Sequence, residues 1–353
     1  MTLPVLTLTE RVLLCLALFV IIIFGIRMTG SVATILLVAL VLSFLLYPAT
    51  MWLRQRGLSH PAAVSMVTVI AAICIVLFVY LTVMSFNVIL TDLPLYQNEL
   101  ALRLTDVSSF LSAHGISTGN LLASTPDLAS VIPALLSSLL NLGTDLMDLF
   151  FVAVTTFFML LEAPPIIARA EAMLSESPEK CRQLAKMSGF VVDFMVVRTE
   201  TNFVHGVLFG GSLALMGVHA AILWGILTFV LGYIPYFGLI LAAIPALFFA
   251  WLQFGIWGVI AVVAIVCVLN LIVENPVFSY LASRKFEIPA LVVILSVIFW
   301  GWLLGLAGML FSVPFTLMVV TLFSFSDEFA WINTLLGLDP LFVERGSDGT
   351  PPQ

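Results

Sequence analysis

Two polar side chains, Asn270 and Glu274, end a long apolar run and are able to bind a small solute or a coupling ion. They are four residues apart, so they share one face if this segment is helical. An ionisable residue at the edge of such a run is a functional candidate by default. Two alternatives stay open: Glu274 pairs with Arg284 or Lys285 at an interface, and Asn270 caps a broken helix.

A second polar group occupies the start and the middle of the same apolar run. Asn202 and His205 open it, and His205 is either a proton relay, because imidazole changes charge near neutral pH, or an interfacial residue. Tyr233 and Tyr236 flank Pro235. Their rings are able to stack on and hydrogen-bond a sugar-like ring, and anchoring at a membrane interface is the alternative.

The composition identifies the elements that must hold these side chains. Of 353 residues, 62% are apolar and only 9% are charged, whereas a soluble chain carries roughly a quarter charged residues. A membrane-spanning helix needs about 20 apolar residues. Charged residues are absent from 28–53, 57–91, 201–273 and 288–326. This pattern excludes a soluble globule, a nucleic-acid-binding module and a disordered chain, and it predicts an all-α, polytopic integral membrane protein.

The apolar runs predict about six full spans plus two broken or re-entrant helical hairpins. The first hairpin turns at 27–30, a third apolar segment covers about 62–90, and a fourth span ends at Pro164-Pro165. The predicted regions are a three-span unit (1–90), an extracytoplasmic amphipathic helical segment (91–143), the fourth span with a charged cytoplasmic helix (144–200), a core with interrupted helices (201–326) and a cytoplasmic tail (327–353).

Positive charges predict the orientation, because Lys and Arg are retained on the cytoplasmic side. If 201–273 crosses an even number of times, 11 Lys and Arg residues lie inside and two, Arg27 and Arg103, lie outside. Both termini are then cytoplasmic. The block is 73 residues long, enough for about three passes, so one portion should enter and leave on the same side.

Glycine and proline interrupt both large apolar blocks. Proline lacks an amide hydrogen and glycine tolerates positive φ, and broken backbone at membrane depth survives only where protein or water satisfies it. Paired interruptions point to a transporter binding site, whereas ordinary turns or close-packing positions are the alternative. The first interruption contains Gly232, Tyr233, Pro235 and Gly238, with Pro245 beyond it, and the second contains Gly301, Gly305 and Gly308.

Signatures of other chemistry are missing from the sequence. There is no P-loop, no zinc-binding His-Glu-x-x-His pair, no Gly-x-Ser-x-Gly elbow and no cluster of Cys and His. The four cysteines are expected to be free, buried thiols. We therefore expect no enzymatic activity, no cofactor and no metal site.

The interrupted segments also carry a family likeness. The stretches 233–238, 241–245, 295–305 and 308–314, together with 158–164 and 25–27, resemble the signature of the autoinducer-2 exporter family. The resemblance implies a homo-oligomeric secondary transporter, such as a pentamer, that exports autoinducer-2 across the bacterial inner membrane. Other members resemble sodium/proton or lithium/proton antiporters. Phe278 and Ser279 stand where the family has a Glu-Pro pair, which leaves specificity open.

The sequence thus favours a secondary transporter that exports a small polar signalling molecule similar to autoinducer-2, with the lipid bilayer and further copies of the chain as partners. The alternative is a monovalent cation/proton antiporter with Glu274 as the cycling carboxylate. An intramembrane enzyme and a non-transporting scaffold are weaker hypotheses. The predicted substrate-binding residues are Asn270, Tyr233, Pro235, Gly238, Pro245, Glu274, Asn202, His205, Gly301, Gly305 and Gly308.

Overall fold

A computed structural model of the chain describes residues 8–114, 142–175, 177–276, 288–324 and 334–336. All regular elements in these ranges are helices, which confirms the predicted all-α class. Among the described residues, five helices are long and apolar enough to cross a membrane, and several apolar helices are shorter. The protein is therefore a polytopic helical membrane protein.

The N-terminal helices follow the predicted apolar segments. Helix α1 (Leu8–Met28) and α2 (Gly30–Gln55) meet at Thr29, within the predicted turn. Helix α3 (His60–Thr91) starts after Gly57, whose φ is +95°, and has proline in its first turn. Proline fits there because the first amide of a helix has no intrahelical partner.

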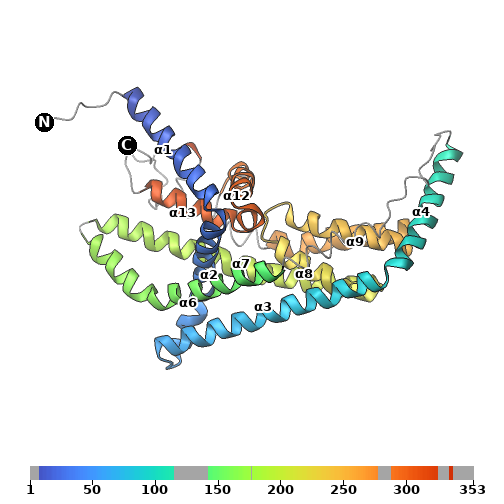
Figure 1. Cartoon of the computed structure of the whole chain (residues 1–353), viewed down its shortest axis with the longest axis horizontal. Helices are drawn as coiled ribbons and strands as arrows, with labels where there is room; N and C mark the ends of the chain where they lie inside the picture. Colours follow the sequence, from blue (N-terminus) through green and yellow to red (C-terminus); the bar gives the residue numbers. More distant parts are fainter. Residues whose placement is uncertain (1–7, 115–141, 176, 277–287, 325–333, 337–353) are drawn as a thin grey trace.

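The polar segment that follows α3 begins with one amphipathic helix, α4 (Leu93–Ala113). The rest of the predicted extracytoplasmic segment, 115–141, lies outside the described residues, as does most of the predicted tail. Helix α6 (Leu142–Met173) continues through Pro164 and Pro165, so the predicted end of the apolar span does not end the helix. Proline removes a backbone hydrogen bond, and the ribbon of α6 bends over its last part (Figure 1).

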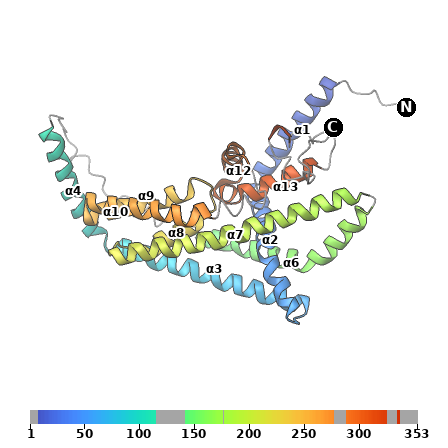
Figure 2. The same cartoon turned by 180° about the vertical axis from the view of Figure 1, so that it is seen from behind.

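Helices α7 (Pro178–Met216) and α8 (Ala221–Leu231) form an antiparallel hairpin with backbones in direct contact. Gly206 and Gly210 lie one helical turn apart on α7 and face Gly225 of α8. A Cβ at Gly206 would lie 2.6 Å from the carbonyl oxygen of Gly225. Only glycine permits so close an approach. The two helices run side by side in both views (Figures 1 and 2).

The chain then reverses twice more. Helix α9 (Gly238–Phe254) is followed by α10 (Ile256–Leu269) across a turn at Gly255, and α10 ends in a single π-helical turn, η2 (Asn270–Glu274). The second apolar block forms α12 (Ala290–Leu310) and α13 (Ser312–Ser324). One buried cluster joins the end of α7 to α8, α9 and α10, and another joins the middle of α7 to α2, α12 and α13. Helix α7 therefore connects both parts of the core.

Candidate functional site

Three polar side chains form a buried stripe on α7. Arg198, Asn202 and His205 follow the spacing i, i+4 and i+7, which places them on one helical face. Asn202 is 1% exposed and His205 is 3% exposed, so both predicted residues are in the protein interior. This face meets the first interruption and the π-helical turn η2.

Arg198 of α7 forms an ion pair with Glu274, which ends η2. Its Nη1 donates to both carboxylate oxygens of Glu274, at 3.0 and 3.3 Å. The side chains are 7% and 13% exposed. Glu274 therefore pairs with a residue 76 positions earlier. Arg284 and Lys285, the partners considered from the sequence, lie outside the described residues.

The first interruption is locked onto the same face of α7. A Cβ at Gly232 would lie 2.5 Å from Asn202 Oδ1, so only glycine fits beside this amide. The hydroxyls of Tyr233 and Thr199 are 2.6 Å apart. Because the Thr199 hydroxyl donates to the Met195 carbonyl, Tyr233 is the donor to Thr199. The broken backbone is thus held by side chains of α7.

Several nitrogens of this cluster have no hydrogen-bond partner. Arg198 Nε, Asn202 Nδ2 and His205 Nε2 are buried and unpaired, and His205 interacts electrostatically with both Glu274 and Arg198. An unpaired buried polar group costs about 1–3 kcal/mol. Such groups in a native structure call for an explanation, and a ligand is one. The arrangement offers donors from α7 beside a carboxylate and an interrupted helix.

The helix breaks at the first interruption for the reasons that the sequence predicted. Helix α8 ends at Leu231 and α9 begins at Gly238, as the positions of glycine and proline predicted. Tyr236 has φ of +65°, and Gly238 packs directly against the Leu231 carbonyl oxygen, where a Cβ would overlap. Pro235 is buried in this turn, and Pro245 lies inside α9. Gly238 is therefore required by a close approach of two backbone segments.

The second interruption is a sharp turn within α12. Gly305 has φ of 66° and ψ of −145°, which breaks the helix, and Gly308 packs against the Trp300 carbonyl oxygen where a Cβ would overlap. Gly301 contacts Met309 across the turn. Tyr233 of the first interruption lies 6.1 Å, between ring centroids, from Phe311 at the end of α12. The first interruption therefore lies beside the end of α12.

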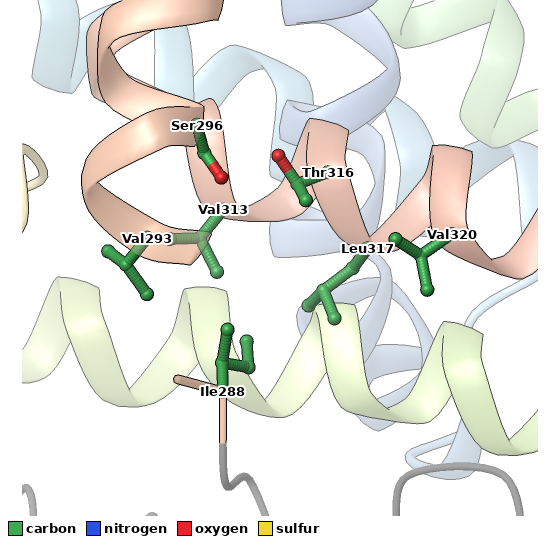
Figure 3. A pocket seen from close by; sticks show the side chains of 7 residues that line it. All are labelled: Ile288, Val293, Ser296, Val313, Thr316, Leu317 and Val320. Atoms are coloured by element: carbon green, nitrogen blue, oxygen red, sulfur yellow. The ribbon is translucent and has the colours of Figure 1, made fainter. Parts of the chain in front are cut away.

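A small cavity beside the second interruption is mainly apolar. Figure 3 shows Ser296 and Thr316 next to each other at its edge, with apolar side chains around the rest. Both hydroxyls are already engaged: Ser296 donates to the Val292 carbonyl, and Thr316 accepts from Trp300 Nε1. Few free polar groups therefore face this cavity, unlike the cluster on α7.

The remaining predicted residue, Asn270, is not brought into the cluster. It begins η2 and is exposed, whereas Glu274 at the end of the same turn is mostly buried. Sequence reasoning missed Arg198, Thr199 and the glycine turn at Gly255. The signals were present: Arg198 continues the spacing of Asn202 and His205, and Gly255-x-x-Gly258 repeats the spacing of Gly305-x-x-Gly308.

An all-helical core of short, interrupted apolar helices around a buried polar cluster is typical of membrane transporters. Comparison with known proteins agrees, because residues 16–326 match the AI-2E family transporters. The chain belongs to this family. It is 30% identical to the AI-2 transport protein TqsA of Escherichia coli K12, over 90% of this chain and 92% of that protein.

Other relatives are named only as transport proteins. The chain is 29% identical to the putative transport protein YhhT of Escherichia coli K12, over 87% of this chain and 88% of that protein. It is 26% identical to the putative transport protein YrrI of Bacillus subtilis, over 80% and 82%. These relatives support a membrane transporter.

Proposed function

We propose that the protein is a secondary transporter that exports a small polar signalling molecule similar to autoinducer-2 across the bacterial inner membrane. The observation that carries this proposal is the set of unpaired, buried nitrogens of Arg198, Asn202 and His205 beside the first interruption. An oxygen-rich solute would accept hydrogen bonds from the Arg198 and Asn202 nitrogens, and its hydroxyl groups would pair with His205 Nε2 in either tautomer. TqsA, the relative with the stated cargo, supports the choice of molecule.

The short helices support movement of this region. Helix α8 has 11 residues and is about 16 Å long, roughly half of the hydrocarbon thickness. A helix of this length does not cross the bilayer alone, so we propose that the two interrupted segments, α8–α9 and α12–α13, are re-entrant or half-spanning hairpins. The substrate site would open when these hairpins move relative to the N-terminal helices.

We retain the predicted setting as part of this proposal: cytoplasmic termini and a homo-oligomer such as a pentamer. The antiporter alternative finds no support in the site. Glu274, its cycling carboxylate, is bound by Arg198 at 3.0 Å and would have to leave this partner before it bound a cation. An exporter of a neutral solute needs no such exchange.

Asn202→Leu tests the proposal, with Asn270→Leu as a matched control. Purified protein is reconstituted into liposomes, and counterflow of autoinducer-2 is measured. Asn202→Leu should lower counterflow by about tenfold or more, the loss of one hydrogen bond to a buried group. Its thermal stability should not fall, because a leucine of similar size removes the unpaired, buried Nδ2 of Asn202.

Asn270→Leu should leave counterflow unchanged, because this amide is exposed. Equal loss in both variants would move the site away from α7. Absence of autoinducer-2 counterflow in the wild-type protein would remove the proposed cargo, and a sodium- or lithium-driven proton flux in its place would establish the antiporter.

A further inference from the structure

Helix α4 lies across the end of the transport core formed by α8, α9 and α10, as both views show (Figures 1 and 2). Tyr96 of α4 is 3% exposed. Its ring contacts Phe249 of α9, at 4.9 Å between centroids, and His219 in the turn between α7 and α8, at 5.8 Å. Burial, with a smaller contribution from Asp92, raises the pKa of Tyr96 to about 12, so the Tyr96 phenol stays protonated.

Arg103, two helical turns further along α4, binds the end of α9. Its Nε donates to the Leu252 carbonyl at 3.0 Å, and its Nη2 donates to the Gln253 carbonyl at 3.3 Å. The last carbonyls of a helix have no intrahelical partner, and a cation is favoured beside them. Arg103 therefore caps α9 with a side chain that comes from 149 positions away in the sequence.

The same guanidinium covers the glycine turn between α9 and α10. Gly255 has φ of 65° and ψ of −149°, and a Cβ at this position would lie 3.3 Å from Arg103 Nη1. The Gln253 side chain also accepts a hydrogen bond from the His219 backbone amide, at 3.3 Å. Arg103 and Gln253 thereby connect α4, the α7–α8 turn and the α9–α10 turn into one contact region.

This contact region opposes movement of the α9–α10 turn. A change in the backbone at Gly255 would displace the carbonyls of Leu252 and Gln253, so both hydrogen bonds from Arg103 must break first. Glu99 and Asp106 lie beside Arg103, at 4.0 and 3.7 Å, on the more exposed side of α4. They provide the guanidinium with acceptors once it leaves α9.

We propose that Arg103 is a positioning residue that holds the α9–α10 turn in its closed arrangement and releases it when the transport core changes conformation. The role assigned to this release rests on the transport function proposed above. The contact itself does not depend on any substrate, so it can be tested without one.

The test measures the accessibility of a cysteine in the contact region. Val218→Cys is introduced into protein whose native cysteines are replaced by serine, because Val218 is 4% exposed in the turn that α4 covers. Labelling of this thiol by a hydrophilic maleimide is followed in lipid nanodiscs. Arg103→Met should raise the labelling rate at least about tenfold, because methionine removes both charge-assisted hydrogen bonds that oppose local opening. Arg103→Lys should give a smaller rise, because lysine retains one hydrogen bond.

Two controls separate this role from general loosening. Val313→Cys in α13, also buried, should stay protected in the Arg103→Met variant. Arg27→Met should leave labelling of Val218→Cys unchanged, because Arg27 contacts Trp302 of α12 instead. Unchanged labelling at 218 in Arg103→Met, or an equal rise at 313, would overturn the proposal. Failure of autoinducer-2 counterflow would leave these labelling rates, and the test, intact.

Discussion

The turn between α9 and α10 and the turn within α12 have the same backbone but different surroundings. Gly255 and Gly305 differ by 1° in φ and 4° in ψ. Three residues after each, Gly258 and Gly308 pack against a carbonyl oxygen eight residues upstream, that of Ala250 or Trp300. The two turns are 50 positions apart and form an internal structural repeat.

The side chains around the repeat differ. The first turn is capped by Arg103 through two hydrogen bonds, and its hairpin leads to the ion pair of Glu274. Near the second turn, the guanidinium of Arg27 lies 4.4 Å from the centroid of the Trp302 ring. A mainly apolar cavity lies between α12 and α13. The backbone geometry is shared and the buried charge is not. This difference favours recognition of a solute in the first region and a mechanical role for both turns.

The largest effect is expected where the regions differ most, at the buried ion pair. Arg198→Met should destabilise the protein by about 3–5 kcal/mol, because it leaves Glu274 buried without a partner. The double variant Arg198→Met/Glu274→Leu should recover most of this loss. Thermal unfolding in detergent measures both. Thr316→Val, which removes the partner of Trp300 in the second region, should cost only about 1–2 kcal/mol. An Arg198→Met variant as stable as Thr316→Val would contradict the distinction.

A smaller and equal effect is expected at the shared close contacts. Gly258→Ala and Gly308→Ala should each cost about 3 kcal/mol, because the new methyl group would overlap a backbone carbonyl oxygen. Gly189→Ala on α7 is the matched control, since open space surrounds that position. It should stabilise its helix by roughly 0.5–1 kcal/mol. Clearly unequal losses at 258 and 308 would refute the structural repeat.

The smallest effect sharpens the comparison at the turn glycines themselves. Gly255→Ala and Gly305→Ala should each cost about 1–3 kcal/mol of backbone strain. At Gly305 nothing lies near the new methyl group, whereas at Gly255 it would press on Arg103. The loss should therefore be greater at 255, and the excess should disappear in an Arg103→Ala background. A double-mutant cycle of unfolding free energies measures this coupling. Additive losses would show that the Arg103 side chain moves aside without an energetic cost.

The sequence was sufficient to predict the helical class and the first interruption, because glycine and proline act locally on the backbone. Helix α8 ends at Leu231 and α9 begins at Gly238, close to the predicted flanks. The partner of Glu274 was not predicted, because Arg198 was counted among the cytoplasmic cations. A contact between residues 76 positions apart is set by tertiary packing, which one sequence does not reveal.

The turn at Gly255 was missed for a different reason. It has no neighbouring proline, and two glycines in an apolar run look the same as close-packing positions of a straight helix. The exposure of Asn270 likewise depends on how η2 packs. Pro164 and Pro165 show the opposite kind of error, in which a strong helix-breaking signal is present but does not end α6.

The glycine contact between α7 and α8 has a consequence for how force travels through the molecule. Side chains normally separate neighbouring helices and adjust to small shifts, but at Gly206, Gly210 and Gly225 the two backbones are in direct contact. We therefore expect α7 and α8 to move as one rigid body. A displacement of the charged end of α7, near Pro178, would then also displace the interruption after Leu231.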